Sequence, residues 1–524
     1  MRIYDTTLRD GMQREGLSLA VGEQLAVALA LARFGVDYLE AGFPASNPKY
    51  GELFSLLEHE DLGATRLAAF GMTRRRDTAA ADDVAMRGLA ECSAPVITIV
   101  GKTWDLHIER VTRVSPEENL RMIEESVAFL RAQGKEVVYD AEHFFDDYAA
   151  HPGYALDCLR AAEAGGAAWI NPCDTNGATL PGRVGEVIRA VRAALPGARL
   201  GIHTHNDAEC AVANSLAAVD AGARLVQGTI NGYGERCGNA NLVSIIPSLA
   251  LKMDHEVLEP EKLSELTSLS HFVAETANLQ PDAWAPYVGR NAFGHKGGMH
   301  VAAMNVEPRS YEHIDPALVG NERQVLVSEL SGRGTIVAKA ADLGIDVDEP
   351  GQVATILARL KELEHEGYHF EVADGSFELL LERETGTYRP LFVLESLRVI
   401  TEKRADGRVE TEATVKIIHE GDRLVSTAEG NGPINALDAA LRAALGPRVP
   451  ELAHIELVNF KVRILDESKG TDAVVRVLLE SGDGHETWGT IGVSENVIEA
   501  SWEALVDSLE HGVRRVARTQ PASA

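Results

Sequence analysis

The first half of the chain repeats one pattern eight times: a short apolar run, then a stretch with helical periodicity. Strands that are apolar throughout and alternate with helices indicate a parallel sheet with both faces covered. Eight units of roughly 30 residues each match a closed (β/α)8 TIM barrel, and a doubly wound open sheet is the alternative. The predicted fold class is therefore α/β, with apolar runs that begin near Ile3, Tyr38, Arg66, Pro95, Glu136, Ala168, Arg199 and Leu225.

Signals for helix ends support this count of units. Ser115 is followed by Pro116 and Glu118, which predicts an N-cap serine, a proline at the first helical position and a capping-box glutamate. Gly35 is placed to end the helix that begins after Val21. In such a barrel we expect function at the C-terminal ends of the strands.

Charge and composition limit the partners. A net charge of −29 repels phosphates at long range, which argues against nucleic acid and anionic membranes. The chain runs from Met1 directly into strand-like sequence, and no stretch reaches the roughly 18 apolar residues of a membrane span. We expect a cytoplasmic enzyme of two or three domains, because 524 residues exceed one compact domain. The five cysteines are scattered without CxxC spacing and are expected to be reduced: Cys92, Cys158, Cys173, Cys210 and Cys237.

The segment from Leu200 to Asp207 is the first candidate site. Its apolar start predicts a buried strand, so His203 and His205, two residues apart, would point to the same side of that strand. This spacing suits a divalent metal that is bound from one edge of the sheet. The alternative is a pair of hydrogen-bonded polar residues at a strand end.

Polar side chains follow most of the other predicted strands as well. The first strand leads into a turn with a carboxylate and a guanidinium, and the fifth leads into acids and an imidazole. Each segment alone also fits a solvated loop or barrel packing. Their accumulation at one end of the barrel predicts an active site that draws on residues 5–13, 40–44, 139–146, 171–177 and 227–239.

Three of these segments resemble a known family. Residues 5–13, 201–207 and 232–239 are similar to the signatures of the metal-dependent, Claisen-condensing barrels that include 2-isopropylmalate, homocitrate and citramalate synthases. Residues 140–145, 226–241 and 295–300 resemble the citramalate synthase branch. Met12 and Pro172 depart from the pattern of the relatives, which bears on substrate preference more than on the chemistry.

The resemblance implies a metal site and a substrate site. The family's metal ligands correspond to Asp10, His203, His205 and Asn239, a mixed oxygen and imidazole set that suits Mg²⁺, Mn²⁺ or Zn²⁺. A 2-oxo acid would bind the metal through its carboxylate and keto oxygen, and the metal would polarise the carbonyl. Arg9 is placed to stabilise the developing alkoxide. Thr175 resembles the family's contact to the 2-oxo acid carboxylate, with a simple cap after a strand as the alternative.

The second substrate implied by the resemblance is acetyl-CoA, which needs a base to remove a methyl proton. The family pattern nominates Glu142, together with His300 and Tyr311 from beyond the barrel, and leaves open which of them takes the proton. His300 could instead activate the water that hydrolyses the thioester, or be an ordinary loop histidine. Lys296 or Arg290 is expected near the phosphates of coenzyme A.

The rest of the chain is expected to contain further domains. We expect the barrel over residues 1–258, mostly helical connecting subdomains over 259–388, a regulatory domain over 389–516 and a tail over 517–524. In relatives the connecting region reaches the partner subunit, which implies a homodimer with sites completed across the interface.

The regulatory domain has an internal duplication in its sequence. Three strands and a helix occur twice: strands near 391–401, 409–418 and 423–429 precede a helix over 434–445, and strands near 454–465, 473–480 and 486–493 precede a helix from 495. This α+β domain of two βββα units resembles the family's amino-acid-sensing domain, which in the citramalate branch responds to isoleucine. A dimerisation module without a ligand is the alternative.

Three functions follow from these observations. The branch resemblance implies an acyltransferase that condenses acetyl-CoA with pyruvate and hydrolyses the thioester, giving (R)-citramalate and CoA for isoleucine biosynthesis. A 2-isopropylmalate or homocitrate synthase would use the same residues with a larger 2-oxo acid, and the loop over residues 101–107 is expected to help decide between them. The third function, a non-catalytic amino-acid sensor, is disfavoured by the intact set of Arg9, Asp10, His203, His205 and Asn239.

Overall fold

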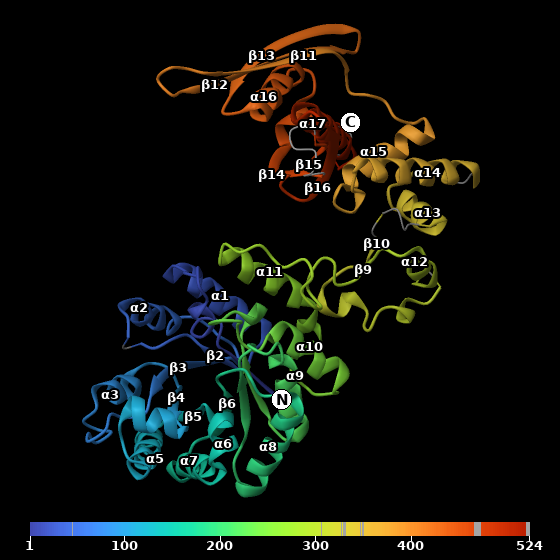
Figure 1. Ribbon diagram of the computed structural model, residues 1–524. Coiled ribbons are helices and arrows are strands. Elements are labelled where there is room, and N and C mark those ends of the chain that lie inside the picture. Colours follow the sequence, from blue (N-terminus) through green and yellow to red (C-terminus); the bar gives the residue numbers. More distant parts are fainter. Residues whose placement is uncertain are drawn as a thin grey trace. The chain divides into compact units, whose positions relative to one another are not determined.

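The computed structural model describes residues 1–44, 46–304, 306–325, 327, 332–345, 347, 350–465 and 473–519 (Figure 1). The chain divides into two compact units, whose positions relative to one another are not determined. Unit 1 comprises Met1–Phe293 and His313–Arg323, and unit 2 comprises Gly294–Glu312 and Gln324–Ala524.

Unit 1 is a closed barrel of eight parallel strands, so the predicted TIM barrel is confirmed and the open sheet is wrong. Each strand pairs with the next along the chain, and the last pairs with the first. The strands are β1 (Arg2–Asp5), β2 (Tyr38–Glu40), β3 (Arg66–Met72), β4 (Val96–Lys102), β5 (Glu136–Glu142), β6 (Trp169–Asp174), β7 (Gly201–Thr204) and β8 (Leu225–Gly228).

Helices surround the barrel and cover the outer faces of its strands (Figure 1). Aliphatic side chains from both layers form one large core, as expected for a parallel sheet buried on both faces. The helices of the eight strand-helix units are α1 (Val21–Phe34), α2 (Pro48–Leu57), α3 (Val84–Glu91), α5 (Pro116–Ala132), α7 (Pro152–Gly165), α8 (Pro181–Ala194), α9 (Ala211–Ala221) and α10 (Leu242–Lys252). Two short helices, α4 (Asp105–His107) and α6 (Phe144–Ala150), follow β4 and β5, and α11 (Leu266–Thr276) adds to the same core.

Three of the four predicted helix-end features are confirmed, including Pro116 at the first position of α5, and one is wrong. Gly35 ends α1 in the left-handed conformation, with a φ of 99° that favours glycine. Ser115 caps α5 by accepting a hydrogen bond from the backbone N–H of Glu118. The capping box is not completed, because the carboxylate of Glu118 binds Arg74 and Arg121 instead.

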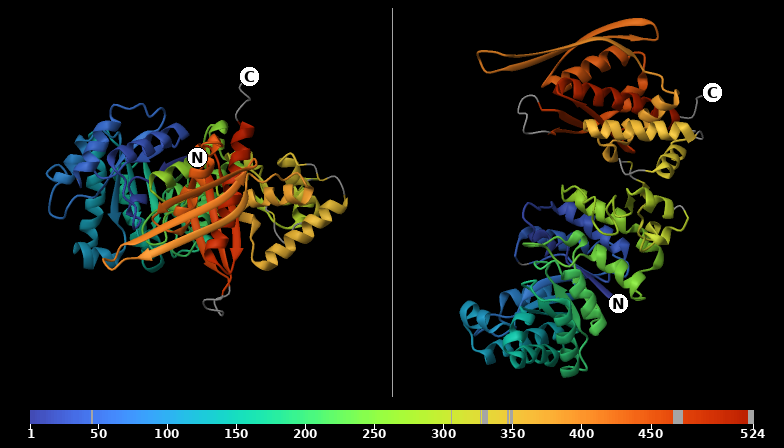
Figure 2. Two further views of the ribbon diagram at one scale, coloured as in Figure 1. Left: turned by 90° about the horizontal axis from the view of Figure 1, so that it is seen from above. Right: turned by 45° about the vertical axis from the view of Figure 1, so that its right-hand side comes forward.

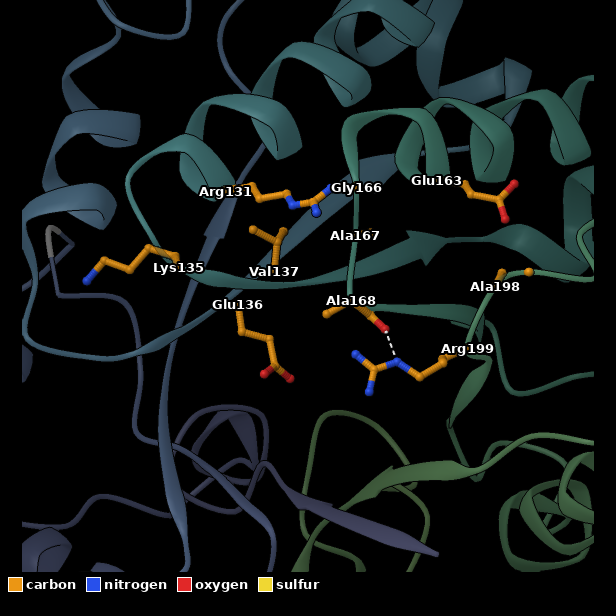
Figure 3. A pocket seen from close by; sticks show the side chains of 11 residues that line it. Arg131, Lys135, Glu136, Val137, Glu163, Gly166, Ala167, Ala168, Ala198 and Arg199 are labelled. Atoms are coloured by element: carbon orange, nitrogen blue, oxygen red, sulfur yellow. Dashed lines mark hydrogen bonds between the residues drawn. The ribbon is translucent and has the colours of Figure 1, made fainter.

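The two ends of the barrel differ in character. Near the N-terminal ends of the strands the interior is filled by large side chains, among them Tyr4, Tyr38, Trp169 and Leu225. A surface pocket of about 360 Å³ lies at this end, between the starts of β5, β6 and β7 and the ends of the neighbouring helices; Arg131, Lys135, Glu136 and Arg199 line it (Figure 3). In TIM barrels this end serves stability, and active sites lie at the opposite end, where the strands have their C-termini.

Unit 2 contains a helical part and the duplicated domain. The helical part comprises α12 (Gly298–Met304), α13 (Arg333–Asp342), α14 (Pro350–Glu366) and α15 (Asp374–Thr385), with two short paired strands, β9 (Gly294–His295) and β10 (Gln324–Val325). Within the described residues, no helix is both long and apolar enough to cross a membrane.

The predicted duplication of βββα units is confirmed. The first unit is β11 (Val393–Lys403), β12 (Val409–His419), β13 (Asp422–Gly430) and α16 (Pro433–Leu445). The second is β14 (Glu456–Ile464), β15 (Val475–Gly482), β16 (Thr487–Ser494) and α17 (Val497–Thr519). Both sheets are antiparallel, and the helices pack against them around a shared core (Figure 2). The predicted tail over 517–524 begins within α17, and residues 520–524 lie outside the described residues.

Candidate active site

The turn after β1 holds Arg9 and Asp10 in the barrel. The carbonyl of Thr6 accepts hydrogen bonds from the backbone N–H groups of Arg9 and Asp10, which makes the turn tight. Arg9 donates from Nε to Oε1 of Glu40 at 2.6 Å, and its Nη1 lies 3.2 Å from Oδ1 of Asp10. The guanidinium also lies over the ring of Phe70, 4.0 Å from its centroid. These contacts hold Arg9 in one position beside Asp10.

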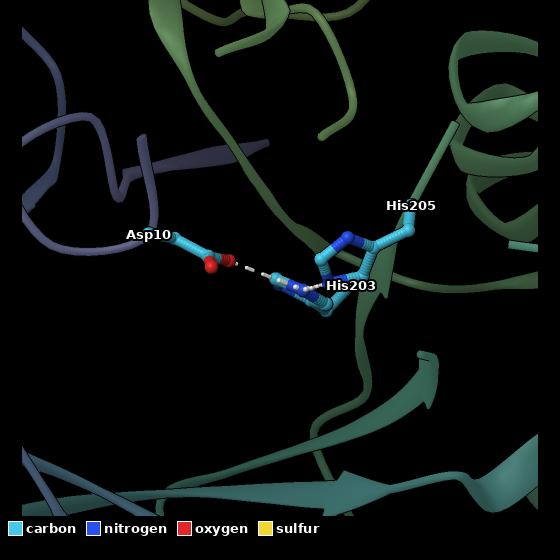
Figure 4. Close-up of side chains that lie close together, drawn as sticks. All are labelled: Asp10, His203 and His205. Carbon is cyan, nitrogen blue, oxygen red and sulfur yellow. Dashed lines mark hydrogen bonds and ion pairs between the residues drawn. The ribbon is translucent and has the colours of Figure 1, made fainter. Parts of the chain in front are cut away.

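His203 and His205 both point into the barrel toward Asp10, as the two-residue spacing on a strand predicts (Figure 4). The two Nε2 atoms are 3.2 Å apart, and Nε2 of His203 lies 3.5 Å from Oδ2 of Asp10. Each residue offers one ligand atom, and these atoms lie within 4.8 Å of one another. All three side chains are buried.

Two oxygen atoms of this cluster have no hydrogen bond. Among the described residues, Oδ2 of Asp10 and Oδ1 of Asn239 are buried without a partner. Asn239 bridges to His205 through the backbone and donates its amide Nδ2 to the carbonyl of Tyr233 at 3.2 Å, so its Oδ1 is the side left free. Buried polar atoms normally have partners, and a bound cation would satisfy these. The four residues therefore fit a divalent metal.

Electrostatics hold these groups in their ligand forms. Burial would raise the pKa of Asp10, but Arg9 and the two histidines lower it below its ordinary value. Burial lowers the pKa of His203, and burial with the neighbouring His203 lowers that of His205 to about 4. A carboxylate and two neutral imidazoles are the forms that bind a metal.

Glu142 and Thr175 lie at the ends of neighbouring strands. Glu142 ends β5 and forms an ion pair with Lys102, the last residue of β4. Thr175 follows β6, and its Oγ1 accepts a hydrogen bond from the backbone N–H of His143 at 2.8 Å. The hydroxyl of Thr175 keeps its own hydrogen for donation.

His300 and Tyr311 belong to unit 2. Their rings stack on each other with centroids 4.1 Å apart, and both side chains are exposed. Because the two units are not placed relative to one another, the predicted residues fall into two groups: the barrel set and this pair. The two residues expected near coenzyme A are divided in the same way, since Arg290 lies in unit 1 and Lys296 in unit 2.

Three polar residues beside the site lie in strand-end segments that the sequence predicts to contribute to it, but no individual role was predicted for any of them. Glu40 holds Arg9 and also accepts a hydrogen bond from the hydroxyl of Tyr4 at 2.9 Å. Gln227 binds Nδ1 of His203, and Asp140 binds Gln227. A charged or amide residue inside an otherwise apolar strand is the signal that marks such positions.

A second cluster of possible ligands lies near the ends of β4 and β5. It comprises Asp105, Asp147 and His151. Nδ1 of His151 lies 3.3 Å from Asp105 and 3.6 Å from Asp147. Asp147 is buried, while the other two side chains are 41% and 57% exposed.

The closed eight-stranded barrel and the candidate site inside it define a class of TIM-barrel proteins with a possible metal site. The family models that match the chain agree with this class. The HMGL-like model matches residues 1–273, the homocitrate synthase post-HMGL domain-like model matches 287–368, and the LeuA allosteric (dimerisation) domain matches 371–513. The HMGL-like family is metal-dependent, and the Asp10 cluster is a possible metal site.

Comparison with individual proteins identifies one family within this class. The (R)-citramalate synthase of Synechocystis sp. is 48% identical over 98% of this chain and 96% of its own length. That of Geobacter sulfurreducens is 49% identical over 98% of both chains. The 2-isopropylmalate synthase of Pyrococcus furiosus is 32% identical over 98% of this chain and 99% of its own. The chain belongs to the (R)-citramalate synthase family, and it is a condensing acyltransferase.

Proposed function

We propose that the chain condenses acetyl-CoA with pyruvate and releases (R)-citramalate and CoA, as a step of isoleucine biosynthesis in the cytoplasm. The observation that carries this proposal is the buried cluster of Asp10, His203 and His205 next to the guanidinium of Arg9. A keto oxygen that gains negative charge needs positive charge close by, and this part of the barrel supplies it. Relatives that are named (R)-citramalate synthases support the choice of substrate.

Asp10, His203, His205 and Asn239 would hold a divalent cation, Mg²⁺, Mn²⁺ or Zn²⁺. Bound there, it would supply Lewis-acid polarisation of the 2-oxo acid carbonyl and orient that acid. Arg9, held by Glu40, would donate hydrogen bonds to the oxygen that becomes an alkoxide. Thr175 would donate its free hydroxyl hydrogen to the substrate carboxylate.

Glu142 is the proposed base for the methyl group of acetyl-CoA. Its ion pair with Lys102 holds the carboxylate at the C-terminal end of β5. His300 and Tyr311 would enter the site from the connecting region, with His300 as the candidate for activating the hydrolytic water. Arg290 and Lys296 remain the proposed contacts for the phosphates of coenzyme A.

We propose that the catalytic barrel covers residues 1–258, the connecting subdomains 259–388 and the regulatory domain 389–516, and that the chain forms a homodimer. Apolar side chains on the strands of both sheets support a covered surface, because each of these is more than half exposed: Val393, Val409, Val425, Val458 and Ile464. The matching domain model is described as allosteric and dimerising, which also supports isoleucine as an inhibitor. Light scattering that gave a monomeric mass with full activity would remove the dimer.

The test of the main proposal is the release of free thiol from acetyl-CoA with Mg²⁺ or Mn²⁺ present. Pyruvate, 2-oxobutanoate, 2-oxoisovalerate and 2-oxoglutarate are compared as acceptors. Preference for pyruvate is expected, followed by inhibition by isoleucine. Preference for 2-oxoisovalerate would favour the 2-isopropylmalate reaction, and no thiol release with any acceptor would overturn the proposal in favour of a sensor.

A further inference from the structure

A chain of buried hydrogen bonds runs from His203 into the barrel. Nδ1 of His203 lies 2.8 Å from Oε1 of Gln227, and Nε2 of Gln227 donates to Oδ1 of Asp140 at 3.0 Å. The same oxygen of Asp140 accepts a second hydrogen bond from Nδ2 of Asn171 at 2.8 Å. All four side chains are at least nine-tenths buried, so water does not compete for these bonds.

We propose that Gln227, oriented by Asp140, is a positioning residue that fixes the tautomer of His203 for metal binding. This inference deepens the proposed metal site and rests on it. Nothing in the proposed chemistry requires Gln227 or Asp140 to touch the substrate.

The orientation of the Gln227 amide follows from its partners. An amide group has one donor side and one acceptor side. Asp140 accepts two hydrogen bonds at one oxygen, so the side of Gln227 that faces it must be the NH₂ group. The carbonyl oxygen of Gln227 must therefore face His203. A flipped amide would place two acceptors against each other and two nitrogens against each other.

The tautomer of His203 follows in turn. Because Oε1 of Gln227 can only accept, Nδ1 of His203 must carry the hydrogen. In a neutral imidazole this leaves the lone pair on Nε2, which faces Asp10 and His205. His203 therefore presents a ready ligand atom, and none of its binding energy is lost in choosing between tautomers.

His205 provides an internal contrast. Within the described part of the chain, its Nδ1 is buried without a hydrogen-bond partner. The two histidines thus differ in support, although they differ little in burial. We infer that His203 is the preorganised ligand of the pair, and that its support lies in β8 and β5.

The experiment measures Mn²⁺ affinity of the full chain by electron paramagnetic resonance at pH 6.0 and 7.5, with the variant Gln227→Met. Methionine keeps the approximate volume and removes the acceptor, so we expect the dissociation constant to rise about 10- to 100-fold. The matched control is Gln24→Met, the same change at a glutamine that is equally buried in α1 outside the barrel interior. It should bind Mn²⁺ within about twofold of the unmodified chain. Thermal unfolding of the metal-free proteins checks that both variants fold.

Rescue by a conservative variant separates positioning from packing. In Gln227→Glu, the new carboxyl next to Asp140 keeps one shared proton at pH 6.0, because two buried carboxylates resist ionising together. It then offers the same donor and acceptor as the amide, and we expect Mn²⁺ affinity within about threefold of the unmodified chain at pH 6.0.

Two outcomes would overturn the positioning role of Gln227, and a third would overturn the metal site. Unchanged affinity in Gln227→Met would overturn the positioning role while leaving the metal site intact. Equal weakening in Gln227→Glu and Gln227→Met at pH 6.0 would also overturn it, because volume or packing would then be the cause. An unmodified chain that binds no Mn²⁺ would instead overturn the proposed metal site itself, which keeps the two failures apart.

Discussion

Two clusters of the same residue types lie at the same end of the barrel, and the pKa values of their buried aspartates are shifted in opposite directions. Asp10, His203 and His205 are at most 6% exposed. In the cluster of Asp105, Asp147 and His151, only Asp147 is buried. Both sets could bring their ligand atoms within 4.8 Å, so proximity alone does not separate a metal site from an ordinary ion-pair cluster.

The difference lies in how each buried carboxylate is compensated. Burial alone would raise the pKa of both aspartates. Asp10 has Arg9 beside it and keeps its pKa below the ordinary value, so it stays a charged ligand. Burial, with Asp105 nearby, raises the pKa of Asp147 to about 6, so its charged form is destabilised in the fold. We infer that the first cluster binds a cation and that the second does not.

The largest expected effect comes from removing a ligand of the buried cluster. Asp10→Ala or His203→Ala should lose bound metal and lower kcat/KM by about 10³-fold or more, because Lewis-acid polarisation is worth several kcal/mol. Metal content of the purified variants and thiol release measure the two losses together. An Asp10→Ala protein with normal activity would contradict the ligand assignment.

The second-largest expected effect distinguishes the role of the Arg9 charge from that of the metal ligands. Arg9→Ala should keep the metal and lower turnover by about 10²- to 10³-fold, because it removes a donor to the developing alkoxide. It also leaves the fully buried Glu40 without its cation, so Arg9→Lys is the variant that better preserves the fold. For Arg9→Lys we expect unchanged Mn²⁺ stoichiometry and a lower kcat. Loss of metal in Arg9→Lys would show that the arginine acts mainly by holding Asp10.

The smallest expected effect comes from a substitution in the second cluster, which comprises Asp105, Asp147 and His151. Asp147→Asn should leave Mn²⁺ stoichiometry and activity unchanged and should raise the free energy of unfolding by about 1 kcal/mol at pH 7. Its folded-state pKa of about 6 lies above the ordinary 3.8, so the carboxylate destabilises the fold increasingly as the pH rises from 4 to 6. The amide still accepts from the backbone N–H of Asp105.

The measurement is denaturant unfolding of both proteins at pH 4 and pH 7, with and without a chelator. The advantage of the variant should shrink toward pH 4. If Asp147→Asn lost one bound Mn²⁺ per chain, or was less stable than the unmodified protein only when metal was present, the second cluster would be a cation site and the contrast would fail.

Most of the fold could be predicted because its signals are local. The apolar runs at Ile3 and Glu136 mark strands by their own composition, and Gly35 ends its helix through a backbone conformation that glycine adopts easily. The duplication of three strands and a helix is likewise readable from alternation and turn residues. Prediction failed where a side chain had a choice of partners: Glu118 binds Arg74 and Arg121 in place of the start of its own helix.

The candidate site likewise has features that local sequence signals predict and features that depend on which partners the fold brings together. The spacing of His203 and His205 was sufficient to suggest a metal site, because a strand dictates which side its alternate residues face. Asp10 was nominated as a third ligand by the resemblance to the family. The partners that prepare those ligands come from other strands: Glu40 beside Arg9, and Gln227 with Asp140 behind His203.

The sequence by itself thus determined the barrel, the repeated domain and the types of residue at the strand ends. Only the tertiary structure decided which aspartate keeps a low pKa and which histidine nitrogen is free. The physical reason is that a pKa and a tautomer depend on burial and on neighbours within a few ångströms, and those neighbours are brought together by closing the barrel.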